Sequence, residues 1–195
     1  MILCNTEIQK AIDESRLIIR PEPLPRRPTE GKQCPYGTHS VDLALDDEIS
    51  IPRQGTYVID LTRQGSLADF LAQNSTRVKI GGGQGYTLEP NQFILARTRE
   101  YVELSMPPQV DTCLAARIEG KSSRARCGVL VHFTAPTVHP GFKGTLTLEI
   151  INLGPNAFML RPGMAIAQLI IEEVRGLPFE TASQFQGQTT PEGLG

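Results

Sequence analysis

Apolar and polar residues alternate along much of this chain. Between residues 39 and 46, Val41, Leu43 and Leu45 are separated by Asp, Ala and Asp, which is the pattern of a strand with one buried face. Further short apolar segments follow, each bounded by turn residues, at 92–98, 101–104, 112–119, 128–133, 144–152, 158–161 and 165–172. Many short strands at this spacing predict an all-β sandwich or barrel.

The N-terminal pattern is helical instead. Thr6 and Gln9 fit a capping box, and apolar residues follow at helical spacing, so we expect a short helix over residues 6–16. Four prolines between residues 21 and 28 exclude regular structure there. We therefore expect residues 20–37 to form an extended connection.

Residues 62–86 are the least regular part of the chain. A short strand is predicted at residues 58–61 and a helical turn at 66–71. The glycine-rich run at 81–85 lacks the Lys-Ser or Lys-Thr of a phosphate-binding loop, so a hairpin tip or mobile loop is the better interpretation. The function of this region stays open.

Composition limits the remaining choices. The 195 residues suit one domain, which we place at 1–176, followed by a flexible tail at 177–195. A net charge of −2 and the absence of Trp argue against a general nucleic-acid-binding protein. The N-terminus does not resemble a signal peptide, and no apolar stretch is long enough to span a membrane. The four cysteines form no C-x-x-C pair. We expect a cytoplasmic protein with free thiols and no membrane partner.

Positive charge is concentrated in one segment, residues 117–126. Arg117, Lys121, Arg124 and Arg126 contribute four positive charges and Glu119 one negative charge, so the segment carries +3. Together with the flexible backbone and hydroxyls of Gly-Lys-Ser-Ser at 120–123, these side chains could bind a phosphate chain. A solvated basic turn explains the segment equally well.

A single carboxylate stands out in the strand predicted at 144–152. Glu149 lies between Leu148 and Ile150, and period-two alternation places it on one face with Thr145 and Thr147. Burial among apolar residues would raise the pKa of Glu149 toward the range that suits proton transfer. The alternative is an edge-strand glutamate that faces water.

The ordered motifs resemble those of the dCTP deaminase branch of the dUTPase-like superfamily. They cover most of the chain, and the likeness is weakest over residues 52–86. The carrying motifs are Gly-Lys-Ser-Ser at 120–123, Ala-Arg at 125–126, His132 to Ala135, Pro-Gly-Phe-Lys-Gly at 140–144, Leu-Glu at 148–149, Leu-Arg-Pro-Gly-Met at 160–164, Ile-Ala-Gln-Leu at 166–169 and Gln-Gly-Gln at 186–188.

This resemblance implies a distorted jelly-roll subunit, a homotrimer with active sites shared between subunits, and hydrolysis of dCTP to dUTP and ammonia. It implies that Glu149 activates water without zinc, and the H-x-E and P-C-x-x-C strings of zinc deaminases are absent. The implied catalytic residues are Glu149, Ser122, Arg126 and Ala135. The implied nucleotide-binding residues are Lys121, Ser122, Ser123, Arg126, Thr134, Val138, His139, Gln168, Phe179, Gln184 and Gln188. Mg²⁺ would arrive with the triphosphate and have no protein ligands, and dTTP would act as a feedback inhibitor.

Three positions depart from the family pattern. His139 replaces an aspartate that lies near the sugar, which argues against diphosphatase activity. Gln184 replaces a common lysine, and Phe179 or Phe185 a common tyrosine. A dUTP diphosphatase, a bifunctional deaminase–diphosphatase and a non-catalytic nucleotide-sensing trimer therefore remain alternatives.

Overall fold

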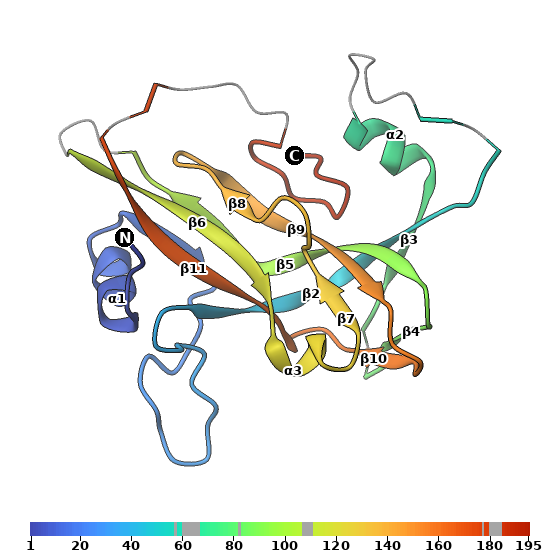
Figure 1. The fold of residues 1–195 in the computed structure, drawn as a ribbon, viewed down its shortest axis with the longest axis horizontal. Coiled ribbons are helices and arrows are strands. Elements are labelled where there is room, and N and C mark those ends of the chain that lie inside the picture. The colour runs from blue at the N-terminus through green and yellow to red at the C-terminus, as the bar shows by residue number, and fades with distance from the viewer. Residues whose placement is uncertain (57, 60–66, 82, 107–110, 177, 180–184) are drawn as a thin grey trace.

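The computed structural model describes residues 1–56, 58–59, 67–81, 83–106, 111–176, 178–179 and 185–195. Strands dominate these residues (Figure 1), as the alternating pattern predicts. The helices are α1 (Asn5–Asp13), α2 (Leu67–Gln73) and α3 (Ser122–Ala125). The strands are β1 (Leu17–Arg20), β2 (Val41–Pro52), β3 (Ser75–Lys79), β4 (Tyr86–Leu88), β5 (Phe93–Leu104), β6 (Thr112–Gly120), β7 (Val129–Val131), β8 (Thr137–Val138), β9 (Lys143–Asn152), β10 (Phe158–Leu160) and β11 (Ala165–Arg175).

Within the described residues, nine strands form one curled antiparallel sheet. Its central order is β7-β9-β5-β2-β11-β6-β8, with β1 also paired to β5 and β3 to β2. Strands β10 and β4 form a separate two-stranded ribbon. The predicted all-β, barrel-like class is confirmed.

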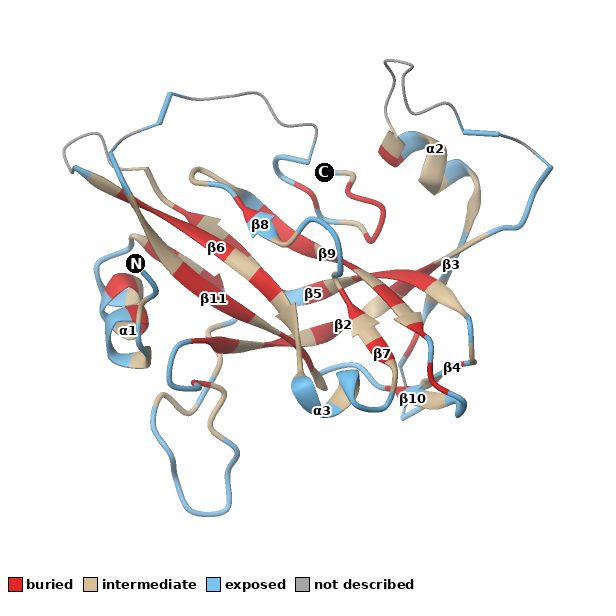
Figure 2. Ribbon diagram, in the orientation of Figure 1, coloured by how far each residue is buried: buried red, intermediate tan, exposed pale blue. Residues whose placement is uncertain are grey.

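The hydrophobic core fills the inside of this curl (Figure 2). On β2, Val41, Leu43 and Leu45 are fully buried, and on β9 Leu148 and Ile150 are fully buried as well. Burial of these aliphatic side chains is the main stabilising contribution to the fold. The alternate residues of the same strands face outward, so β9 presents Thr145, Thr147 and Glu149 away from the core.

Several boundaries differ from the sequence-based expectations. The helix begins one residue before Thr6, with Cys4 as its N-cap, so the predicted capping box is wrong; the amide of Gln9 donates instead to the carbonyl of Arg26 at 2.6 Å. Val58 and Ile59 are exposed and lie in no strand, which contradicts that part of the strand predicted at 58–61. The rest of that segment lies outside the described residues. The two strands predicted at 92–98 and 101–104 are one continuous strand, β5, with a register shift between them.

The C-terminal residues 185–195 return to the sheet. Figure 1 shows this segment beside the first part of β9, and the amide of Gly187 donates to the carbonyl of Lys143 at 2.8 Å. We call residues 185–195 the C-terminal strap. The strap therefore runs beside the first residues of β9, on the side of that strand that does not pair with β5.

Candidate functional site

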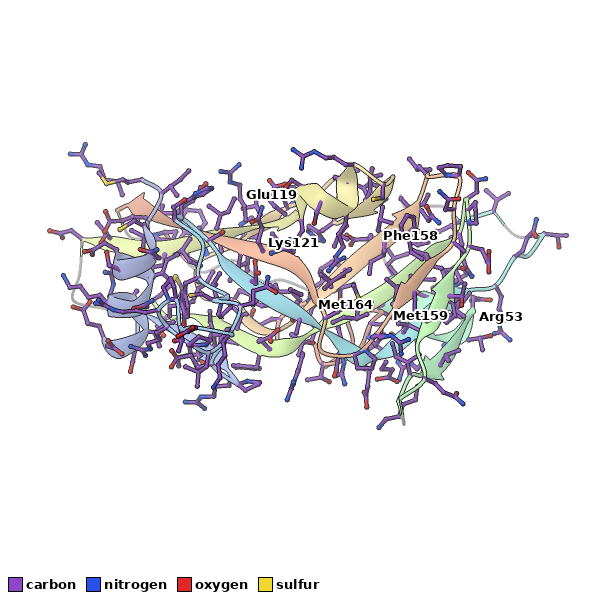
Figure 3. The ribbon with its side chains drawn as sticks, turned by 90° about the horizontal axis from the view of Figure 1, so that it is seen from below. Arg53, Glu119, Lys121, Phe158, Met159 and Met164 are labelled. Atoms are coloured by element: carbon purple, nitrogen blue, oxygen red, sulfur yellow. The ribbon has the colours of Figure 1, made fainter. Side chains whose placement is uncertain are left out.

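The basic segment forms a tight turn between β6 and β7. Lys121 follows β6, and Ser122 and Ser123 open the single turn of α3, where both are exposed. Figure 3 shows the side chains of Glu119 and Lys121 near this turn. The serine hydroxyls and the Arg126 side chain therefore face solvent at one end of the sheet.

Three of the four cations in this segment are already engaged. Arg117 Nε lies 2.6 Å from Oε1 of Glu172, and Lys121 Nζ lies 2.5 Å from Oδ1 of Asp42. Arg124 donates to the carbonyl of Ala165. The side chain of Arg126 is exposed and makes no hydrogen bond or ion pair with any part of the chain that the structure describes. The basic segment is thus a turn whose side chains are fixed by these contacts, with only the guanidinium of Arg126 free among the four cations in the described part of the chain. A solvated basic turn would not need such contacts.

Glu149 is paired with a histidine from the neighbouring strand end. His132 follows β7, its backbone N–H donates to the carbonyl of Glu149 at 2.8 Å, and its Nδ1 lies 2.6 Å from Oε2 of Glu149. His132 adopts φ of 55°, a left-handed conformation that histidine tolerates better than most residues. This conformation turns the chain out of β7 at the point where the ring meets the carboxylate.

The contacts of His132 define its protonation state. Nε2 lies 2.7 Å from the carbonyl oxygen of Ala135, which can only accept, so Nε2 carries a proton. Nδ1 lies 2.6 Å from the carboxylate of Glu149, and this contact favours the imidazolium form of His132. Burial lowers the pKa of His132, but its contacts with Glu149 and with the backbone at Ala135 and Thr147 outweigh burial, so the pKa lies above its ordinary value of 6.5.

Glu149 is not desolvated in the manner expected from its apolar neighbours. Its side chain is 34% exposed, while that of His132 is 12% exposed. The register places Leu95 of β5 beside Glu149, with the leucine and glutamate side chains on the outward face. One carboxylate oxygen is held by the imidazolium, so the other remains available for a ligand. The edge-strand alternative is wrong because β9 lies between β7 and β5.

The remaining predicted site residues surround this pair unevenly. Thr134 is exposed, and Ala135 contributes its carbonyl to His132. Val138 is buried in β8, where it pairs with Ala116, so its backbone rather than its side chain is placed for recognition. His139 is exposed, and its carbonyl accepts a hydrogen bond from Phe142.

Gln168 and the tail residues lie farther apart along the chain. Gln168 lies on β11, with its amide within 3.4 Å of the carbonyl of Gly120, directly before Lys121. Phe179 is 87% exposed, and Gln184 lies outside the described residues. Gln188 is buried in the strap, where its amide donates to the carbonyl of Thr145 at 2.7 Å.

The basic turn and the Glu149 pair are not joined within one chain. Helix α3 contacts β7, which in turn pairs with β9. Across the ranges that the structure describes, no hydrogen bond or ion pair links Ser122 or Arg126 to Glu149. The basic turn and the Glu149–His132 pair are therefore separate features of the single chain described here.

The described residues contain neither a cluster suited to a metal ion nor a membrane-spanning helix. No group of three or more His, Cys, Asp or Glu side chains in these ranges is arranged to hold a metal ion. None of the helices described here is long and apolar enough to cross a membrane.

The sequence motifs include His132 but indicate no role for it. The missed signal is positional: a histidine directly after the strand that pairs with the glutamate-bearing strand. Sequence alone does not give that pairing, because it depends on the β7–β9 register, Val131 opposite Ile150.

Fold and site together define a class: an all-β protein with a carboxylate–imidazolium pair on the outer face of a curled sheet and a basic serine-containing turn nearby. The comparisons specify this class further. A family model described as dCTP deaminase-like matches residues 2–174. The chain therefore belongs to the dCTP deaminase-like family.

Curated relatives agree with that assignment. The chain is 34% identical to the dCTP deaminase of Natronomonas pharaonis, over 98% of this chain and 93% of that protein. It is 33% identical to the dUMP-forming dCTP deaminase of Methanobrevibacter smithii, with the same coverage. Among solved structures, the 2'-deoxycytidine 5'-triphosphate deaminase of Agrobacterium tumefaciens has the same fold, with a TM-score of 0.59 at 22% identity, over 87% of this chain and 47% of that one.

Proposed function

We propose that this protein hydrolyses dCTP to dUTP and ammonia. The observation that carries the proposal is the Glu149–His132 pair in a chain of the dCTP deaminase-like family. Relatives that span nearly the whole chain bear the name dCTP deaminase. The reaction supplies a precursor for pyrimidine deoxynucleotides, and a cytoplasmic location would suit it.

Glu149 acts as the general base of the proposed reaction. Its free oxygen takes a proton from water as the water oxygen bonds to C4 of cytosine, and the carboxyl then delivers that proton to N3. A second proton passes from the new hydroxyl to the amino group, the C4–N4 bond breaks, and ammonia leaves. His132 holds the other oxygen of Glu149 through the 2.6 Å contact and fixes the direction of the carboxylate.

Other groups near Glu149 would position the water and the base. Ser122, Arg126 and the backbone at Ala135 are the proposed catalytic partners. The hydroxyl of Thr147, two residues before Glu149 on the same face, is buried with no hydrogen-bond partner among the described residues. It offers a donor or acceptor beside the pair, where a reacting water would lie.

The basic turn would hold the phosphates. Lys121, Ser122, Ser123 and Arg126 present an ammonium, two hydroxyls and a guanidinium, which together suit a triphosphate. Mg²⁺ would arrive with the nucleotide and be bound by phosphate oxygens. Asp42, a carboxylate beside this turn, is already paired with Lys121, which fits an ion carried by the substrate rather than by the protein.

A homotrimer with shared active sites would close the two halves of the site. Within one chain the serine turn makes no bond to Glu149, so a neighbouring subunit would supply Ser122 and Arg126. The base and sugar would lie against Thr134, Val138, His139 and Gln168, and the tail with Phe179, Gln184 and Gln188 would cover the nucleotide.

One assay tests the proposal and separates it from its rival. Purified protein is incubated with dCTP and Mg²⁺, and ammonia, dUTP, dUMP and pyrophosphate are followed. Ammonia with dUTP supports the proposal. Ammonia with dUMP and pyrophosphate would instead indicate the bifunctional reaction, which the name of the Methanobrevibacter smithii relative favours. Tight dCTP binding without ammonia would indicate a nucleotide sensor. Adding dTTP to the same assay tests feedback inhibition.

A further inference from the structure

The C-terminal strap is bound to the start of β9. The amide of Gly187 donates to the carbonyl of Lys143, the amide of Thr145 donates to the carbonyl of Gln188 at 2.9 Å, and the side-chain amide of Gln188 returns to Thr145. Gly144 lies so close to the strap that a Cβ there would be 2.8 Å from the Gln188 carbonyl oxygen. The strap is thus held as an added strand-like segment at one end of the outward face.

A second anchor lies across the sheet on β3. Arg77 binds the carboxylate of Glu192 with both ends of its guanidinium, Nε at 3.1 Å from Oε1 and Nη2 at 2.7 Å from Oε2. The Glu192 side chain is fully buried, whereas Arg77 is 40% exposed. Burial raises the pKa of Glu192, but the contact with Arg77 outweighs it, so the pKa is lowered and the carboxylate is charged.

The sheet register connects this anchor to the proposed catalytic pair. Arg77 of β3 lies opposite Ser50 of β2, Ser50 opposite Leu95 of β5, and Leu95 opposite Glu149 of β9. Residues opposite each other in antiparallel strands point to the same face, so these four side chains form one outward row. The strap therefore has one anchor at Arg77, in the same row of side chains as Glu149, and a second anchor at Lys143 and Thr145, which precede Glu149 on β9.

We propose that the Arg77–Glu192 ion pair is a latch that holds the strap across the outward face carrying Glu149, and that both residues are positioning residues for the deamination. This inference rests on the proposed function for its catalytic part only. Both latch residues lie outside the motifs that carry the family resemblance: Arg77 is in the region of weakest likeness, and Glu192 lies beyond the matched residues 2–174.

The latch works because a buried carboxylate needs its partner. An unpaired charge in a desolvated place is strongly unfavourable, so Glu192 can occupy its position only while Arg77 neutralises it. When the pair is lost, the strap must release Glu192 to water and give up its bonds to β9. A released strap would shield and order the substrate less well, which should weaken binding more than it slows the chemical step.

Hydrogen exchange tests the latch directly. In Glu192→Gln, the amides of Gly187 and Thr145 should exchange at least about tenfold faster than in the wild type, because both depend on the docked strap. Glu22→Gln is the matched control, since Glu22 forms the same two-bond contact with Arg26 far from the strap. The control should leave both amides unchanged. If Glu192→Gln also leaves them unchanged, the latch does not exist.

Paired variants and kinetics test the positioning role. Arg77→Gln should speed exchange more than Glu192→Gln, because it leaves the buried carboxylate of Glu192 without its partner. The double variant should be no faster than Arg77→Gln, because it removes that unpaired charge as well. Arg77→Lys keeps the positive charge but loses the two-bond contact of the guanidinium. Its exchange rates should lie between those of the wild type and Arg77→Gln, and it replaces Arg77→Gln in the test if that variant does not fold. The KM for dCTP should rise about threefold or more in Glu192→Gln with kcat within about twofold of wild type. Faster exchange with an unchanged KM would overturn the positioning role. Absence of dCTP turnover in the wild type would refute the proposed function while the exchange result still decides the latch.

Discussion

Replacing Glu149 with glutamine removes a charge and a proton acceptor while preserving size. General-base catalysis contributes about 10²- to 10⁴-fold to a rate, so kcat for dCTP should fall by that factor, or about 2.7–5.4 kcal/mol. The same change removes the negative charge from the 2.6 Å contact with His132. A charge-assisted hydrogen bond contributes about 1.5–3 kcal/mol, and partial exposure of Glu149 favours the lower half of that range.

The histidine provides an independent measurement of the same change. The chain has three histidines, so their ring protons can be followed by NMR titration with few overlaps. In Glu149→Gln, burial is no longer offset by the carboxylate, and the pKa of His132 should fall from its raised value. His39→Gln is a control variant that should leave the pKa of His132 unchanged.

The pH dependence of stability follows from the sign of this shift. Because the folded-state pKa of His132 is raised, the pair stabilises the wild type fully below pH 6.5 and loses that contribution as the pH rises through the raised value. Thermal unfolding midpoints of wild type and Glu149→Gln should therefore differ most at pH 6 and converge at higher pH. An unchanged pKa of His132 in the variant would refute the imidazolium–carboxylate pair, and wild-type turnover would refute the general base.

Two further predictions concern the basic turn and the packing behind it. Lys121→Met keeps the aliphatic stem but removes the proposed phosphate contact. In steady-state kinetics, the KM for dCTP should therefore rise about tenfold with little change in kcat. An unchanged KM would exclude a role of Lys121 in nucleotide binding. Gly154→Ala places a Cβ 2.1 Å from the Cys127 carbonyl oxygen and should destabilise the fold by about 1–3 kcal/mol in urea unfolding. Gly81→Ala, which has nothing within 4 Å, should change stability far less.

The sequence predicted the structure best in the long strands, where alternating burial produces a two-residue period of apolar side chains. Alternation in β2 and β9 identified the buried positions and placed Glu149 on one face with Thr145 and Thr147, and the structure shows that this face is the outward one. It did not find β1, β3, β4 or β8, which have two to five residues each. The capping box failed because Thr6 satisfied a local pattern while the chain entered the helix one residue earlier, with Cys4 in the extended conformation.

The charged contacts could not be predicted from the sequence, for a different reason. His132 and Glu149 are 17 positions apart, Arg77 and Glu192 are 115 apart, and each pair depends on which strands are neighbours rather than on local spacing. From the sequence, Lys121, Arg117 and Arg124 looked equally free to bind phosphate, yet two of them are bound by carboxylates of other strands and the third by a carbonyl. Burial patterns determine which face a side chain occupies, and strand order determines its partner. The chemistry proposed for Glu149 depends on both, because its period places it on the outward face and only the adjacent end of β7 supplies the imidazolium that orients it.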